Sequence, residues 1–159
     1  MRKTIAIGML GLALVSNSAA AQTAVEQAQI LRDFNVSVVD YANRHRCLMF
    51  PEANNVTPPA PKLFTLPVAM VVRQMIARAI AETDGPVIGG VGAAHRAIVM
   101  HPFPGAELSD FPRVLKDALP LLPAPLDYRL IGNDLVIRDA DADLVVAVLR
   151  NALGAFPTR

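Results

Sequence analysis

The stretch LDYRLIGNDLVIRD, residues 126–139, decides the fold, because it places two short apolar runs on either side of a turn sequence. The runs Asp127–Ile131 and Leu135–Asp139 are rich in residue types that favour strands. Between them, Gly132-Asn133-Asp134 supplies the residue types that a tight turn uses. This arrangement predicts a β-hairpin in the C-terminal part of the chain.

The residues after the hairpin, Asp141–Leu153, are compatible with two structures. The run Leu144–Val148 is short and apolar enough to form a third strand. A terminal helix is favoured by an apolar stripe at helical spacing, which consists of Leu144, Val145, Val148, Leu149 and Ala152. Gly154 suits the end of such a helix. We therefore expect a helix over 141–153 and a loose tail over 155–159.

Upstream, the periodicity predicts a first long helix from Ala24 to about Arg46. Apolar residues recur there at steps of three and four, at Leu31, Phe34, Val38 and Tyr41 or Ala42. The segment Pro51–Lys62 contains four prolines and predicts a linker, because proline interrupts both helices and central strands.

A second helix is predicted over Val68–Glu82, with Thr65 as its N-cap and Pro67 in its first turn. Its apolar face consists of Val68, Val71, Val72, Met75, Ile76 and Ala79. A short third helix is predicted over Asp110–Leu119, capped by Ser109 and again with a proline in its first turn. The predicted fold class is α+β: two main helices, a short third helix, and a C-terminal β-hairpin followed by a helix.

The first 21 residues predict a cleavable signal peptide. Arg2 and Lys3 form a short basic region, an uncharged apolar stretch follows, and Ala19-Ala20-Ala21 places small residues before the expected cut. A membrane anchor is the alternative, but it needs about 20 apolar residues, and this run is about half as long. We expect the chain to be periplasmic or secreted, with one domain over 22–154.

The charge balance argues against binding to nucleic acid or to an anionic membrane surface. Once Arg2 and Lys3 leave with the signal peptide, 13 basic residues remain against 14 acidic ones. A near-neutral chain with scattered charges lacks the basic patch that such partners require.

Three segments near the C-terminus resemble a family of small exported proteobacterial proteins. The segments are LPLLP at 119–123, LDYRLIGNDLVIRD at 126–139 and ADLVV at 142–146. The family pattern reads LPPLP…LEYRFVGRDLILRDVxANLIVDxL, from which this chain departs at Asn133, Asp143 and Ala147. Residues 34–46 and 63–80 match the family's FNxRVxxY and IFTPEVAxxFRRLI segments loosely. The family has no assigned function, so the resemblance implies export and domain layout but no activity. The hairpin alone is also similar to that of periplasmic nickel/cobalt-homeostasis proteins.

A soft-metal site is the sharpest chemical hypothesis. His45, Cys47 and Met49 alternate, so an extended segment would project all three on one face. Imidazole, thiolate and thioether suit copper, and Met100-His101 offers further ligands. If the first helix continued to Met49 instead, the three side chains would spread around it.

Other candidate residues have structural explanations that fit them better. Ser37 and Ser109 lie outside any nucleophile motif, and a hydrolase or thiol enzyme would need His95 or His101 beside Cys47 or Ser109. Gly89-Gly90-Val91-Gly92 predicts a flexible turn rather than a phosphate loop. The acidic group Asp134, Asp139, Asp141 and Asp143 predicts turn and helix-start carboxylates, with Arg129 and Arg138 as pairing partners, rather than a calcium loop.

The sequence therefore favours a non-catalytic envelope protein that acts through protein–protein contact, with no cofactor. Its partner would be another envelope protein. Cys47, the single cysteine, leaves open a disulfide-linked dimer. The alternative is a periplasmic copper-type binding protein that uses His45, Cys47 and Met49.

Overall fold

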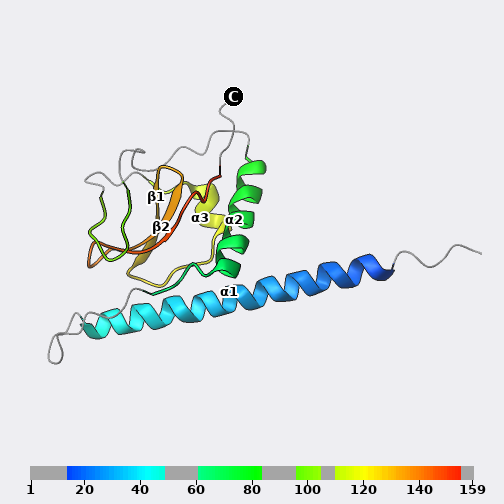
Figure 1. Cartoon of the computed structure of the whole chain (residues 1–159), viewed down its shortest axis with the longest axis horizontal. Coiled ribbons are helices and arrows are strands. Elements are labelled where there is room, and N and C mark those ends of the chain that lie inside the picture. Colours follow the sequence, from blue (N-terminus) through cyan, green and yellow to red (C-terminus); the bar gives the residue numbers. More distant parts are fainter. Residues whose placement is uncertain (1–13, 49–60, 84–95, 105–109, 155–159) are drawn as a thin grey trace, which may run out of the picture.

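The computed structural model describes residues 14–48, 61–83, 96–104 and 110–154. They form an α+β fold in which three helices precede a three-stranded antiparallel sheet (Figure 1). In chain order the elements are α1 (Leu14–Leu48), α2 (Leu66–Ala81), α3 (Arg113–Ala118), β1 (Leu126–Ile131), β2 (Asp134–Asp139) and β3 (Leu144–Leu149).

The predicted hairpin is confirmed as β1 and β2. They pair antiparallel with Ile131 opposite Asp134, which leaves a two-residue loop. Gly132 opens this loop with a φ of +56°, a left-handed conformation that glycine adopts at no steric cost. The turn chemistry therefore sets the register of the hairpin.

The expected terminal helix over 141–153 is wrong, because residues 144–149 form the strand β3. It pairs antiparallel with β2, so that the sheet has the order β1-β2-β3. Both faces of this strand are covered: Val146 lies in one hydrophobic cluster and Val145 in another. A strand that is buried on both sides has apolar residues at successive positions, without the alternation of apolar and polar residues that marks a half-exposed strand. The apolar residues of 144–152 could therefore be taken for the apolar side of a helix.

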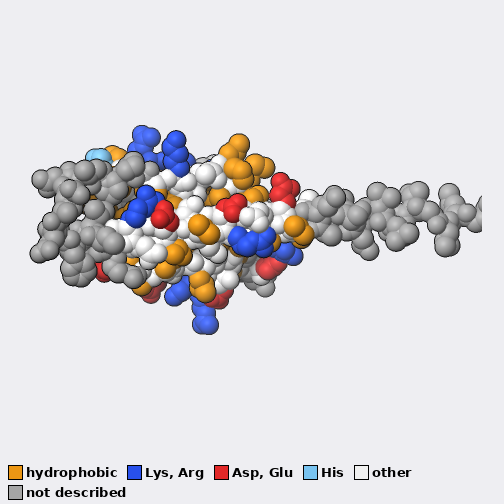
Figure 2. All heavy atoms as spheres, turned by 90° about the horizontal axis from the view of Figure 1, so that it is seen from below, with side chains coloured by type: hydrophobic (Ala, Val, Ile, Leu, Met, Phe, Trp, Pro, Cys, Tyr) orange, Lys and Arg blue, Asp and Glu red, His pale blue; other side chains and the backbone are white. Residues whose placement is uncertain are grey.

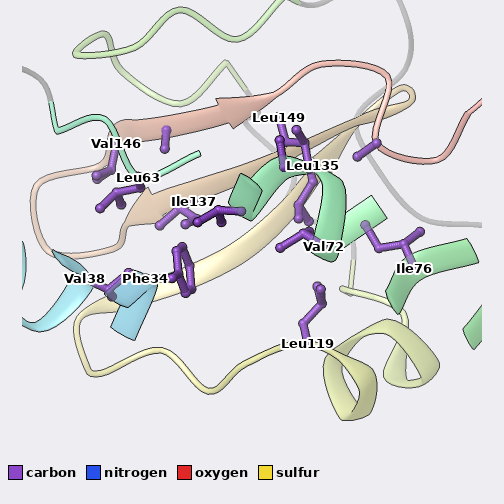
Figure 3. Packing of buried hydrophobic residues seen from close by; sticks show 14 of the residues in the cluster. Phe34, Val38, Leu63, Val72, Ile76, Leu119, Leu135, Ile137, Val146 and Leu149 are labelled. Atoms are coloured by element: carbon purple, nitrogen blue, oxygen red, sulfur yellow. The ribbon is translucent and has the colours of Figure 1, made fainter. Parts of the chain in front are cut away.

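The helices cover one face of the sheet. In Figure 1, α1 runs beneath the domain and α2 stands on it beside the strands. Between these layers lies the main core, whose labelled members in Figure 3 are Phe34, Val38, Leu63, Val72, Ile76, Leu119, Leu135, Ile137, Val146 and Leu149. The rings of Phe34 and Phe64 stack with centroids 6.2 Å apart and join α1 to the chain that leads into α2.

Both main helices are confirmed, but α1 is longer than the predicted span 24–46 and runs from Leu14 to Leu48. In α1 the buried positions Phe34, Val38, Tyr41 and Ala42 belong to the expected stripe. In α2 the helix begins two residues earlier than expected, with Thr65 in extended N-cap geometry but without a side-chain cap hydrogen bond. Of the linker predicted over 51–62, residues 51–60 lie outside the described ranges.

The third helix, α3, is shorter than the predicted span 110–119. It begins after Pro112, which occupies the N-cap position. Proline disfavours helical geometry in the residue before it, so Asp110 and Phe111 stay outside the helix, and Pro120 has the same effect on Leu119. Ser109, the predicted cap, lies outside the described residues.

The other face of the sheet is covered by residues 96–104. The N–H of Met100 donates to the carbonyl of Val145 at 2.7 Å, and the N–H of Val145 donates to the carbonyl of His101 at 2.9 Å. This segment therefore lies along the outer edge of β3. Its buried residues Ala97 and Phe103 form a second, smaller cluster with Ile131, Val136 and Val145.

The N-terminal prediction concerns residues that are largely outside the described part. Residues 1–13 are not described, so the signal peptide stays a prediction, as does the loose tail over 155–159. Within the ranges that the structure describes, no helix combines the length and the apolar character needed to cross a bilayer.

Candidate functional site

A cluster of charged side chains lies on the sheet face opposite the helices, and Arg138 of β2 is at its centre. Its guanidinium contacts Asp127 at 3.3 Å and Asp143 at 3.4 Å, and its side chain is only 9% exposed. It also stacks over the ring of Phe103, 5.4 Å from the centroid. Asp127 accepts a second, closer contact from Arg129 at 2.7 Å. These pairs connect β1, β2, the β2–β3 turn and the covering segment.

The cluster balances its charges internally and is therefore a structural device. Two arginines face two aspartates, which keeps buried charge compensated. Within the described part of the chain, Asp127 Oδ1 and Arg138 Nε are buried without a hydrogen-bond partner. These atoms belong to groups that are already paired through their other atoms. The predicted pairing of Arg129 and Arg138 with nearby aspartates is confirmed for Arg138 and Asp143.

A second polar contact ties α1 to the sheet through Asp139, which is fully buried. Its Oδ1 accepts the N–H groups of Asp141 and Ala142, both at 3.1 Å, and so shapes the β2–β3 turn. Tyr41 of α1 donates its hydroxyl to Oδ2 at 3.5 Å. Burial, and then the negative charge of Asp139, raise the pKa of Tyr41 to about 12.

Tyr128 lies on the helix-facing side of β1. Its ring stacks on Phe111 with centroids 5.9 Å apart, and burial raises the pKa of its hydroxyl well above the usual value. The tyrosine is thus held protonated in the core. Because a general base or acid works best with a pKa near the ambient pH, neither Tyr41 nor Tyr128 suits that role.

The structure places two of the three predicted metal ligands, His45 and Cys47, in the last turn of α1, which continues to Leu48. The extended segment on which the metal hypothesis was based is therefore not formed over residues 45–48. Met49 lies outside the described residues, and the metal site stays a prediction. Within the described ranges, no group of three or more His, Cys, Asp or Glu side chains is arranged to hold a metal ion.

The other candidate residues separate into described and undescribed ones. Ser37 is exposed in α1, and its hydroxyl donates to the carbonyl of Asp33 at 2.9 Å, a local helix contact. His101 is exposed, and its Nδ1 lies 3.2 Å from the carbonyl of Val99. Ser109, His95 and residues 89–92 lie outside the described part.

The acidic group has structural roles in turns, as expected, but not at a helix start. Asp134 pairs with Arg150 at 2.6 Å and accepts the N–H of Asn151 at 2.8 Å. Asp143 adopts a φ of +50° in the β2–β3 turn. The expectation that Asp141 and Asp143 stabilise a helix N-terminus is wrong, because β3 follows them.

Exposed hydrophobic side chains lie on the outward sides of α1 and α2, and the sequence pattern did not predict them. They comprise Val25 (67% exposed), Val36 (69%) and Val39 (45%) on α1, and Leu66 (74%) and Met70 (63%) on α2. Seen from the α1 side, hydrophobic groups lie among charges of both signs (Figure 2). In the sequence, these residues could have been found because each lies outside the apolar stripe that faces the core on its helix.

Comparisons with protein family models, with curated proteins and with solved structures find no significant match for this chain. The resemblance of residues 119–146 to a family of exported proteins is therefore still a prediction.

Proposed function

We propose that this chain is an exported protein of the bacterial envelope that acts through protein–protein contact and not by catalysis. The exposed hydrophobic side chains on the outward sides of α1 and α2 are the observation that carries the proposal. A single exposed apolar residue is ordinary, but Val25, Val36 and Val39 share one side of α1, and Leu66 and Met70 share one side of α2, so each helix offers a partner an apolar row.

The arrangement of the core supports this role. Phe34, Val72 and Ile76 are buried almost completely, so both helices are fixed on the sheet by their inward sides. A rigid support of this kind presents the outward sides in a defined geometry, which lowers the entropic cost of binding. The polar groups support the same conclusion, because Arg138 and Asp139 make contacts that hold the sheet together and the hydroxyl of Ser37 bonds within its own helix.

Site-specific photo-crosslinking in the native host tests the proposal. A photoreactive amino acid at Met70 or Val36 should form a discrete crosslinked species in the envelope fraction. The same group at Arg113, exposed on α3, is the matched control and should not. Equal crosslinking at all three positions, or none at any, would contradict a specific contact role.

The intact mass of the same preparation tests export. A mass that begins at Gln22 in the periplasmic fraction is the expected result. An uncut chain in the cytoplasmic fraction would overturn the envelope assignment.

A further inference from the structure

The outward side of α1 carries a pattern that repeats every seven residues. Because seven residues make almost two helical turns, residues at this spacing lie along one side of the helix, here the side opposite Phe34. We call this row of residues the α1 stripe; it consists of Val25, Gln29, Arg32, Val36, Val39 and Asn43. The row beside it is acidic throughout and exposed, and consists of Glu26, Asp33 and Asp40.

The outward side of α2 carries a matching pattern with the opposite charge. The α2 stripe is uncharged and exposed, and consists of Leu66, Pro67, Met70, Gln74, Ala77 and Ala81. From Pro67 onward its spacing alternates between three and four, which is the spacing of a helix-packing seam. The alanines allow a second helix to approach closely. The charged residues of α2 are Arg73 and Arg78, one on each side of the stripe.

We propose that the α2 stripe of one molecule docks on the α1 stripe of a second copy of this chain. The two stripes do not meet within one molecule. Gln74 of the α2 stripe accepts a hydrogen bond from Gln27 of α1 at 2.9 Å, but Gln27 lies on the same side of α1 as Phe34 and outside the α1 stripe. Because an arginine stands on either side of the α2 stripe, one of them faces the acidic row of α1 whether the helices pair parallel or antiparallel. This inference rests on the proposed contact role and names its partner.

Charge favours this cross-pairing over pairing of identical stripes. Two α1 stripes packed antiparallel would bring their acidic rows together, and two α2 stripes would bring their arginines together. The local contacts that these charges already make are exposed: Asp40 pairs with Arg44 and Arg78 with Glu82, Asp33 accepts from Gln29, and Arg73 donates to the carbonyl of Arg150 at 2.9 Å. They can be exchanged for contacts with the second molecule. Arg32 is the one charged residue within the α1 stripe, and it already bonds Gln29.

A contact between two different stripes is heterologous, so it either closes reciprocally into a dimer or extends into larger assemblies. Sedimentation velocity of the purified chain over a range of concentrations measures this. We expect association that increases with concentration and weakens in high salt, because the flanking charges are exposed and screened by ions. A chain that stays monomeric at every concentration would overturn the inference.

Variants that disable one stripe each test which surfaces meet. Val36→Lys places a cation on the α1 stripe, against the arginines of the partner's α2 helix. Met70→Glu places an anion on the α2 stripe, against the acidic row. Each variant alone should associate at least about tenfold more weakly than the natural chain. The mixture should associate again, since the intact α2 stripe of one variant meets the intact α1 stripe of the other.

Leu121→Lys is the matched control, because Leu121 is 87% exposed but lies on neither stripe. It should associate like the natural chain, and circular dichroism of all three variants should match. If the two stripe variants associate normally, or their mixture stays monomeric, the cross-pairing is wrong. If the natural chain is monomeric while Met70 still crosslinks to a different envelope protein, self-association fails and the proposed function stands.

Discussion

Alternate residues of β2 face two different surroundings. Leu135 and Ile137 face the helices and lie in a cluster made of apolar side chains. Val136 and Arg138 face residues 96–104, where a small apolar cluster adjoins the ion pairs of Arg138. The helix-facing side is therefore stabilised by burial and packing, whereas the other side depends on specific polar partners. We therefore expect truncation of neighbouring residues on this strand to change the free energy of unfolding by different amounts.

Ile137→Ala should have the largest effect, because Ile137 is fully buried between the helices and the sheet. Loss of its side chain leaves a cavity that the rigid layers cannot close, and we expect a loss of about 2–5 kcal/mol in the free energy of unfolding. Urea unfolding measures it. Leu121→Ala, at an exposed site, should change stability by less than about 0.5 kcal/mol. Equal effects would remove the distinction between core and surface.

Arg138→Met should have an intermediate effect. It removes the cation that Asp127 and Asp143 share, but Asp127 keeps its contact with Arg129. We expect a loss of about 1–3 kcal/mol, the cost of leaving a buried polar group with fewer partners.

A double-mutant cycle with Asp127→Asn tests the cause of this effect. If the ion pair causes the loss, the two substitutions should not add. Full additivity would show that the pair with Asp127 does not cause the loss, which would then come from the pair with Asp143 or from packing on Phe103.

Tyr41→Phe should cost less, about 0.5–1.5 kcal/mol, because it removes one long hydrogen bond to Asp139. It should also alter the response to alkaline pH. The folded pKa of Tyr41 is raised from 10.0 to about 12, so folding favours the protonated form. The stability from this effect is complete below pH 10 and is lost as the pH rises from 10 to about 12.

Urea unfolding at pH 9 and pH 11 measures the alkaline effect. The natural chain should lose stability between these values, and Tyr41→Phe should lose less. Tyr128→Phe is the companion variant, since the pKa of Tyr128 is raised as well. An unchanged alkaline loss in Tyr41→Phe would show that Tyr41 does not contribute.

Ser37→Ala should have the smallest effect. The hydroxyl of Ser37 bonds a carbonyl within its own helix, a contact that does not stabilise helices, and alanine is the better helix former. We expect unchanged or slightly higher stability, by at most about 0.5 kcal/mol, in the same urea experiment. A large loss would indicate a role for Ser37 outside its helix.

The elements predicted correctly from the sequence are those with a strong local cause. The hairpin follows from Gly132 at the turn, and α2 follows from a wide apolar face with a proline in its first turn. Local residue types decide these elements, so no knowledge of distant contacts is needed.

The elements that were missed depend on contacts between distant parts of the chain. The sequence of β3 predicted a helix because Val145 and Val146 are both apolar. They are buried on opposite faces of the strand by segments that are far away in the sequence. The ion pairs of Arg138 were partly anticipated, but its contact with Phe103 was not, since residues 96–104 gave no clear pattern. The two outward stripes were not predicted, because they are recognised only once the structure shows which side of each helix faces the core.

The order of the elements also governs when the chain can fold during its synthesis. Phe34 and Val38 of α1 are buried in the same cluster as Leu135 and Ile137, which belong to the last strands to be made. Until those strands emerge, both helices have no sheet against which to bury their apolar sides, and most of the stability of a helix in a protein comes from such packing. A nascent chain that ends before Leu126 should therefore remain unfolded, as limited proteolysis of arrested chains would show. Because the core is completed late, the polypeptide would stay unfolded, and able to pass through a narrow protein channel, until translation is nearly finished.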